Sequence, residues 1–308
     1  MPFSFADIGT PPAHLFSTTE IPPSPHLQSI PPGTHQWLGM DSEARYQRAP
    51  HPLFGADDVT YSINPQGYRT WDLSQASEVG RDAVRVACIG SSGAFGAGLP
   101  QSATFPNLFR TLVEEQVRRP VVLWNLSLGG ASAEYVTRML FSAIPVLRPH
   151  LLLLTCFPFN RRELIGETGR VFVASATPHW QQRLTDPGHW VMDKACSKVC
   201  NPYTDLINFV TNLKVWESLC DDAGIAWLFT TEAYASQLAP LEFLLREPGK
   251  MVGPGIHALI KAHQDNPATG LARDMQHAGT RPNQELAQLL FTRLMELYAP
   301  QVNAVARK

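Results

Sequence analysis

Short apolar runs alternate with segments of helical periodicity through most of the chain, and this alternation constrains the fold more than any other feature. The four runs are residues 83–89, 121–126, 151–156 and 225–230. The segments with apolar residues at helical spacing are 104–117, 131–147, 206–220 and 284–297. Such runs are typical of strands buried on both faces of a parallel sheet. The alternation predicts a three-layer α/β/α fold with a central parallel sheet.

The ends of this pattern suggest a division of the chain. Residues 1–80 contain three Pro-Pro pairs, which predict extended segments and turns, so we interpret them as an N-terminal extension packed on the core. Residues 81–300 then form one domain. Within it, 158–204 lacks clear periodicity and predicts an irregular segment, and 161–204 is a candidate cap over a site.

Charge and composition exclude several classes of protein. The 308 residues carry 25 Lys+Arg against 27 Asp+Glu, which argues against a nucleic-acid partner. A hydrophobic fraction of 44% argues against a largely disordered chain. The longest apolar run, Leu151–Phe157, is too short to span a membrane, and we recognise no signal peptide. These features predict a cytoplasmic protein, and they indicate no particular oligomeric state.

The cysteines and histidines do not predict a bound metal. The five cysteines are scattered, as in a protein whose thiols stay reduced. Cys196 and Cys200 follow His179 and His189, but no second cysteine pair completes a zinc-type spacing. We therefore expect no metal and no cofactor.

Functional residues in a parallel sheet are expected just after the strands, because the carboxyl ends of the strands border the binding crevice. After the first run the chain reads Gly90-Ser91-Ser92-Gly93. The loop has neither the Gly-Lys ending of a phosphate-binding loop nor the spacing G-x-G-x-x-G. Two interpretations remain, a serine presented on a tight turn for nucleophilic attack, or a plain turn with incidental serines.

Three further strand or helix ends carry polar or small residues. Asn125 lies at the end of the second run, Gly130 follows that run, and Asn160 follows the third. Asp274 and His277 have the spacing Asp-x-x-His before the last helix, so that the carboxylate can orient the imidazole as a base. Each segment alone also fits an ordinary turn.

In this order the four segments resemble the SGNH/GDSL hydrolase superfamily, over roughly residues 60–295. The resemblance implies a serine esterase that works without a cofactor on a small-molecule ester. Ser92 would be the nucleophile, His277 the general base and Asp274 its orienting acid. Ser92, Gly130 and Asn160 would form the oxyanion hole.

One upstream segment strengthens the resemblance. Residues 64–69, with the sequence NPQGYR, are similar to an Asn-x-x-Gly-aromatic-Arg element that precedes the nucleophile strand in one branch of the superfamily.

The chain also departs from the family pattern. Ser91 stands where the family has Asp, and Asn160 is followed by Arg161 rather than Asp. Ser91 is also a rival nucleophile, because adjacent turn residues can be confused in register. Ser91, Arg161, Trp180 and Trp190 are candidates for contact with substrate.

Three alternatives stay open at this point. The same residues would serve an acyltransferase, in which an alcohol rather than water accepts the acyl group. A non-catalytic binding module on the same scaffold is the second alternative. The third is an α/β-hydrolase, although there the acid usually lies well before the histidine.

Overall fold

The computed structural model describes much of the chain. The described residues are 21, 23–24, 32–36, 59–70, 73, 79–80, 82–129, 131–156, 161–165, 171–175, 202–231, 248–272 and 277–306. For 34–36, 161–165, 171–175, 202–207 and a few further positions, only the backbone path is described.

The central sheet has four parallel strands in the order β4-β3-β5-β8. These strands are β3 (Val84–Ile89), β4 (Val121–Asn125), β5 (Leu151–Cys156) and β8 (Ala226–Thr231). Val86 marks the register, because it lies opposite Leu123 on one side and Leu151 on the other. The chain thus starts near the middle of the sheet, moves to one edge and then returns past β3 to the other edge, which is the flavodoxin-like order.

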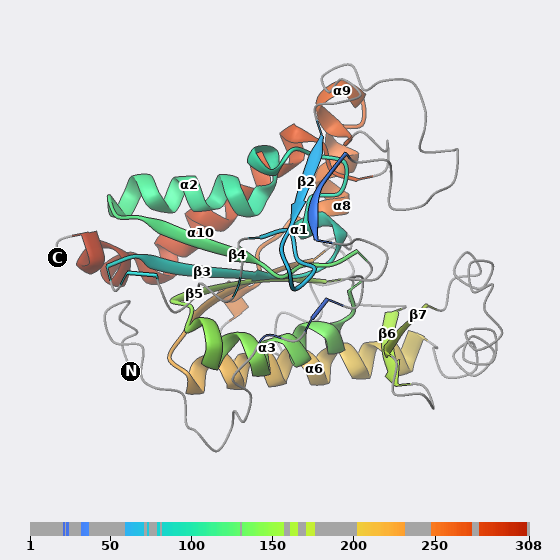
Figure 1. Ribbon diagram of the computed structural model, residues 1–308, viewed down its shortest axis with the longest axis horizontal. Coiled ribbons are helices and arrows are strands. Elements are labelled where there is room, and N and C mark those ends of the chain that lie inside the picture. The colour runs from blue at the N-terminus through green and yellow to red at the C-terminus, as the bar shows by residue number, and fades with distance from the viewer. Residues whose placement is uncertain are drawn as a thin grey trace.

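Helices cover both faces of this sheet (Figure 1). α2 (Phe105–Val117) and α10 (Thr280–Ala306) lie on one face, and α3 (Ala133–Leu147) and α6 (Pro202–Asp222) lie on the other. Two apolar clusters fill the spaces between the layers, one against α3 and α6 and one against α2 and α10. The predicted three-layer α/β/α fold is confirmed.

The remaining elements are short. The helices among them are α1 (Ser92–Phe95), η3 (Gln101–Ala103), η5 (Pro248–Lys250), α8 (Ile256–Ala262) and α9 (Pro267–Gly270). The strands are β1 (Gly33–Gln36), which pairs with β2 (Thr60–Ile63), and β6 (Arg161–Ile165), which pairs with β7 (Val171–Ser175).

Local sequence explains why the flanking helices form where they do. In α2, residues 105, 109, 113 and 117 are apolar and buried at a spacing of four, which gives the helix one face for the sheet. At the start of α3, the Ser132 hydroxyl accepts a hydrogen bond from the Tyr135 N–H at 3.3 Å, as an N-cap residue does. Each of these helices ends at an arginine in the left-handed conformation, Arg118 and Arg148.

The strands and helices expected from the alternation are present, but one prediction was wrong. Residues 161–165 and 171–175, expected to be irregular, form the antiparallel pair β6–β7. Moreover, α6 begins at Pro202, inside the segment predicted to be irregular. A two-stranded ribbon has too short a pattern to stand out from loop sequence, because each strand has only five residues.

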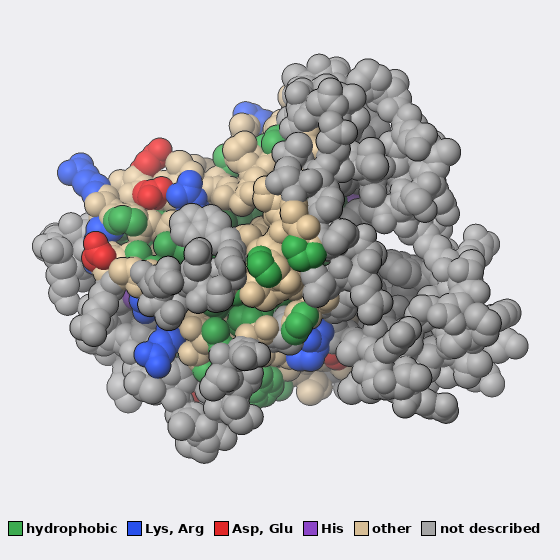
Figure 2. Space-filling model, in the orientation of Figure 1, with side chains coloured by type: hydrophobic (Ala, Val, Ile, Leu, Met, Phe, Trp, Pro, Cys, Tyr) green, Lys and Arg blue, Asp and Glu red, His purple; other side chains and the backbone are tan. Residues whose placement is uncertain are grey.

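The surface of the described part mixes charges of both signs. Figure 2 shows acidic and basic side chains close together over α2, at the upper left of that face. Within α2, Arg110 Nη1 lies 2.8 Å from Glu114 Oε2. Among the described helices, none is both long and apolar enough to cross a membrane.

The carboxyl ends of β3 and β5 approach so closely that only glycine fits between them. A Cβ atom on Gly90 would lie 2.2 Å from Thr155 Cγ2 and 2.7 Å from the Thr155 carbonyl oxygen. No side chain makes contacts this short, so any larger residue at position 90 must push the two strand ends apart. The absence of a side chain at Gly90 therefore sets the distance between the carboxyl ends of β3 and β5, where the following segments begin.

We predict that Gly90→Ala lowers the free energy of unfolding by about 1–3 kcal/mol, because overpacking at a rigid strand end strains the backbone. Adding Thr155→Ala should restore part of that loss, because the nearest clashing atom is removed and Thr155 Oγ1 has no hydrogen-bond partner to lose. Urea denaturation of the single and double variants measures both effects. Gly249→Ala is the control, since its Cβ would meet no atom closer than 3.4 Å. Equal stability of Gly90→Ala and the wild type would contradict the prediction.

Candidate active site

The candidate site lies where the order of the strands reverses. β4 lies on one side of β3 and β5 on the other, so the connections after β3 and β5 leave the sheet in different directions. In open parallel sheets this arrangement opens a crevice at the carboxyl ends of the strands. Ser91 and Ser92 follow β3 directly, after Gly90, and therefore stand at that crevice.

Ser92 is the first residue of the one-turn helix α1, and Ser91 is its N-cap. The first hydrogen bonds of this turn run from the Phe95 N–H to the Ser91 carbonyl and from the Gly96 N–H to the Ser92 carbonyl. The N–H of Ser92 is one of the N-terminal groups that a helix does not use internally. Ser91 is fully buried at 0% exposure, whereas Ser92 retains 7%. Of the two candidate nucleophiles, Ser92 is therefore the more accessible.

The segment after β4 runs alongside the end of β3. The Leu126 N–H donates to the Cys88 carbonyl and the Leu128 N–H donates to the Gly90 carbonyl, both at 2.8 Å. These bonds extend the β3–β4 pairing beyond the strands and carry the chain toward Gly129, next to the start of α1. Gly130, which comes next in the chain, lies outside the described residues.

Asn125, singled out in the sequence, holds α1 against this segment. Its side-chain amide donates to the Ala94 carbonyl at 2.7 Å, and its Oδ1 accepts from the Ser127 N–H at 3.1 Å. Because the side chain is buried and both bonds are internal, Asn125 serves the architecture of the site rather than contact with substrate.

His277 lies in a tight loop before α10. The Ala272 N–H donates to the His277 carbonyl at 2.8 Å, and the Gly279 N–H donates to the Gly270 carbonyl at 2.9 Å. Leu271 and Ala278 form an isolated antiparallel bridge between these two bonds. The histidine itself is half-buried. Backbone hydrogen bonds thus join the two segments, 270–272 and 277–279, that flank residues 273–276.

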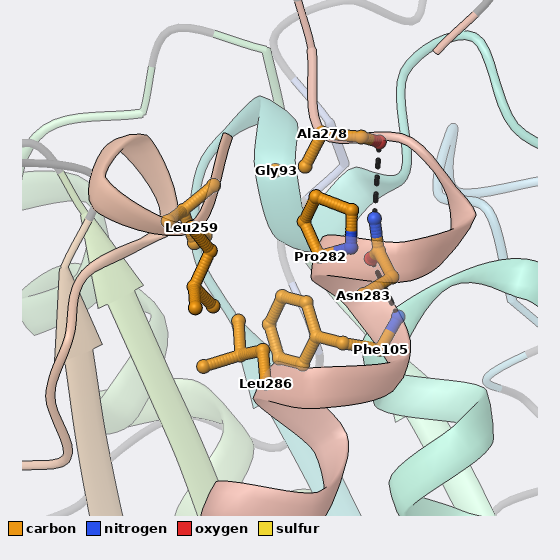
Figure 3. Close-up of a pocket in the computed structure, with 8 residues that line it drawn as sticks. Gly93, Phe105, Leu259, Ala278, Pro282, Asn283 and Leu286 are labelled. Carbon is orange, nitrogen blue, oxygen red and sulfur yellow. Dashed lines mark hydrogen bonds between the residues drawn. The ribbon is translucent and has the colours of Figure 1, made fainter. Parts of the chain in front are cut away.

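A narrow apolar pocket brings the serine turn and the histidine loop together (Figure 3). The residues that line it are Gly93, Phe105, Ile256, Leu259, Ala278, Pro282, Asn283 and Leu286. Gly93 directly follows Ser92, and Ala278 directly follows His277. Two of the sequence-predicted catalytic residues therefore stand beside residues that line the same pocket, although 185 positions separate them along the chain (277 minus 92).

Asn283, which the sequence did not single out, fastens the histidine loop to the core (Figure 3). Its side-chain amide donates to the Ala278 carbonyl at 3.0 Å and the Gly279 carbonyl at 2.8 Å. Its Oδ1 accepts from the Phe105 N–H at the start of α2 at 2.8 Å. One side chain thus joins the first turns of α2 and α10 to the loop. A single asparagine near a helix start carries no sequence signal for this role.

The other predicted site residues cannot be placed. Asp274, Gly130, Asn160, Trp180 and Trp190 lie outside the described residues. Arg161 is the first residue of β6, and only its backbone is described.

The cysteine in β3 is not a rival nucleophile. Cys88 is fully buried in β3, with its sulfur 3.7 Å from Ser127 Oγ. Burial raises the pKa of its thiol to about 12, so the thiolate is absent at neutral pH. No group of three or more potential metal ligands occurs within the described part of the chain.

Comparison with known proteins gives likenesses of fold only. No protein-family model matches the chain, and no curated protein sequence matches it. Among solved structures, the lipase Lip_vut3 from a goat rumen metagenome is 12% identical, with a TM-score of 0.43, covering 68% of this chain and 97% of its own. A lipase/acylhydrolase from Enterococcus faecalis is 14% identical, with a TM-score of 0.37, covering 70% and 96%. The acetylxylan esterase Axe2 from Geobacillus stearothermophilus, solved as a catalytic mutant, is 13% identical, with a TM-score of 0.38, covering 69% and 93%.

We predict that Asn283→Asp destabilises the protein by about 1–3 kcal/mol, although the new side chain has nearly the same size. The substitution keeps the acceptor for the Phe105 N–H but places a carboxylate oxygen against the Ala278 and Gly279 carbonyls. Thermal and urea unfolding measure the change, with the exposed Gln284→Ala as a neutral control. An acidic residue near a helix start usually stabilises. A gain in stability for Asn283→Asp would therefore show that these amide hydrogen bonds are unimportant.

Proposed function

We propose that this protein hydrolyses carboxylic esters of small molecules through a covalent acyl-serine intermediate. The observation that carries the proposal is the proximity of the two segments, because Gly93 and Ala278, the residues next to Ser92 and His277, line the same narrow apolar space, which is too small to admit water. The position of Ser92 at the carboxyl end of β3, where the strand order reverses, agrees with it.

In the proposed acylation step, Ser92 Oγ attacks the ester carbonyl carbon while the His277 imidazole removes the hydroxyl proton. The carbonyl π electrons move to the oxygen, which becomes an oxyanion. When the tetrahedral intermediate collapses, the bond to the leaving alcohol breaks and His277 returns the proton to that alcohol. Asp274 would orient the imidazole and stabilise its protonated form.

In the proposed deacylation step, water takes the place of the alcohol. His277 removes a proton from the water, the hydroxyl attacks the acyl-serine carbonyl, and the carboxylic acid leaves as Ser92 recovers its proton. The backbone N–H groups of Ser92 and Gly130 and the side-chain amide of Asn160 would hold the oxyanion in both steps. One such donor typically contributes about 3–4 kcal/mol to lowering the barrier.

Burial favours Ser92 over Ser91 as the nucleophile. A nucleophilic oxygen must reach a carbonyl carbon, so a fully enclosed hydroxyl is poorly placed for attack. Ser91 has no exposed surface, whereas Ser92 retains some at the start of α1. Ser91 takes the position of the N-cap, although its side chain makes no capping hydrogen bond to α1.

We predict that a fluorophosphonate probe labels Ser92 and no other serine, because the probe reacts with serines activated by a neighbouring base. Peptide mass spectrometry after incubation of the full chain identifies the labelled residue. Ser92→Ala should abolish labelling, whereas Ser91→Ala should still carry the adduct on Ser92. The exposed Ser102→Ala is the matched control and should label at the wild-type rate. An adduct on Ser91 would contradict the prediction and would identify Ser91, rather than Ser92, as the nucleophile.

Turnover of p-nitrophenyl acetate gives the matching activity measurement. Ser92→Ala should reduce kcat at least about 10³-fold, as loss of a serine nucleophile does in other hydrolases. Release of free acetate, rather than an acetylated alcohol added as acceptor, separates hydrolysis from acyl transfer. Equal background rates for the wild type and Ser92→Ala, together with no labelling, would favour a binding module over an enzyme.

A further inference from the structure

We infer that Arg69, which lies before the predicted hydrolase domain, is a positioning residue for the nucleophile turn. The inference rests on the proposed function of Ser92 as the nucleophile and extends it to a residue outside the four motif segments. Its basis is a set of hydrogen bonds between the Arg69 guanidinium and the backbone at the end of α1.

The Arg69 guanidinium binds three backbone carbonyls. Nη1 donates to the Phe95 carbonyl at 3.0 Å and the Gly96 carbonyl at 2.8 Å, and Nη2 donates to the Leu99 carbonyl at 2.7 Å. All three carbonyls belong to the stretch in which α1 ends and the chain turns away. The guanidinium therefore acts as a cationic cap at the carboxyl end of the helix that begins with Ser92.

α1 needs such outside support because it is a single turn. A helix of four residues has few internal hydrogen bonds and does not hold its shape alone. With Asn125 bound to the Ala94 carbonyl, Arg69 completes a row of three consecutive carbonyls, 94 to 96, that accept from side chains of other segments. Movement of this row would displace Ser92, since it lies only one turn away.

The surroundings of Arg69 hold the guanidinium against the turn. Its Cζ lies 4.0 Å from the centroid of the Tyr61 ring, and that ring packs edge to face on Phe95. The Tyr61 hydroxyl accepts a hydrogen bond from the Gly98 N–H at 2.7 Å. A residue of β2 therefore binds the same backbone segment, 95–99, that Arg69 binds. Gly96 has φ +77°, and a Cβ there would come within 3.0 Å of Arg69 Nη1. A side chain at position 96 would therefore press on the guanidinium.

Arg69 keeps its positive charge although burial removes the guanidinium from water, which costs free energy. The side chain is 1% exposed, and burial lowers its pKa to about 10, so it remains a cation at neutral pH. An apolar residue could fill the same volume without desolvating a charge. An apolar residue could not donate hydrogen bonds to the three carbonyls, whereas a guanidinium carries several N–H donors in a fixed planar arrangement.

Misplacement of Ser92 should affect the chemical step more than substrate binding. A displacement of about 1 Å in a reacting group can reduce the rate about 10²-fold. Substrate contacts made elsewhere would be unchanged, so KM should change little. This division between kcat and KM distinguishes a positioning residue from one that touches substrate.

The test compares Arg69→Gln and Arg69→Lys with the wild type, and uses Arg110→Gln on the outer face of α2 as the matched control. Fluorophosphonate labelling counts the competent sites, so that kcat is expressed per site. We expect Arg69→Gln to lower kcat and the labelling rate constant about 10²-fold, with KM within about threefold. Arg69→Lys should recover only part of the rate, because an ammonium cannot reach all three carbonyls in one plane. Arg110→Gln should match the wild type.

Hydrogen–deuterium exchange provides a second readout that does not require catalysis. Peptides covering residues 90–99 should exchange faster in Arg69→Gln, whereas β5 and α10 should exchange as in the wild type. If Arg69→Gln does not fold, Tyr61→Phe replaces it, since this change keeps the ring beside Arg69 and removes the hydroxyl that accepts from the Gly98 N–H. It should lower kcat several-fold without a change in KM.

Two results would overturn the inference. One is a wild-type kcat per labelled site in Arg69→Gln, or in Tyr61→Phe where that variant replaces it. The other is faster exchange spread evenly over the whole protein, which would indicate a merely structural role. Failure of the proposed function has a different signature, since the wild type itself would then not label at Ser92. Exchange at 90–99 would still decide whether Arg69 holds the turn.

Discussion

Three consecutive backbone carbonyls at the end of α1 accept hydrogen bonds from side chains that belong to other segments of the chain. Asn125 supplies the first bond and Arg69 supplies the other two. A one-turn helix depends on such bonds because it cannot satisfy its own terminal groups. The location of Ser92, and with it the geometry of the candidate site, therefore depends on donors that lie 26 to 31 residues away in sequence from the carbonyls they bind.

The same principle recurs on the opposite side of the pocket. The His277 loop makes short backbone pairs at its base, and Asn283 joins it to the starts of both α2 and α10. Each half of the site is thus held by a buried amide or guanidinium that satisfies several backbone groups at once. Such side chains are costly to remove, because every carbonyl or N–H that they leave behind is buried. The rigidity this provides is what a reaction that needs aligned serine and histidine side chains requires.

Residues 59–70, which precede β3, pack against the central sheet and the α1 turn. Sequence composition separates the proline-rich residues 1–80 from the rest of the chain, yet within 59–70 Tyr68 joins the apolar core, and Arg69 and Tyr61 hold the α1 turn. In the sequence, the NPQGYR segment shows only a similarity to a family element. The contacts of this segment in the structure give a physical reason for the asparagine, the tyrosine and the arginine that it contains. The Asn64 side chain accepts from the Tyr68 N–H and closes the turn that places Tyr68 and Arg69 on the core.

The sequence by itself determined the layered fold and the positions of the two central candidates. Buried strands and amphipathic helices have strong periodic patterns, and these predicted β3, β4, β5 and β8 and the helices between them. Ser92 and His277 could be proposed as site residues because a strand end and an Asp-x-x-His spacing are local features. Only the tertiary structure decided the partners that hold them. Arg69, Asn283 and the contact between Gly90 and Thr155 depend on distances between segments far apart in the chain. Such contacts have no period and no local motif, since they arise only when packing brings one segment against another.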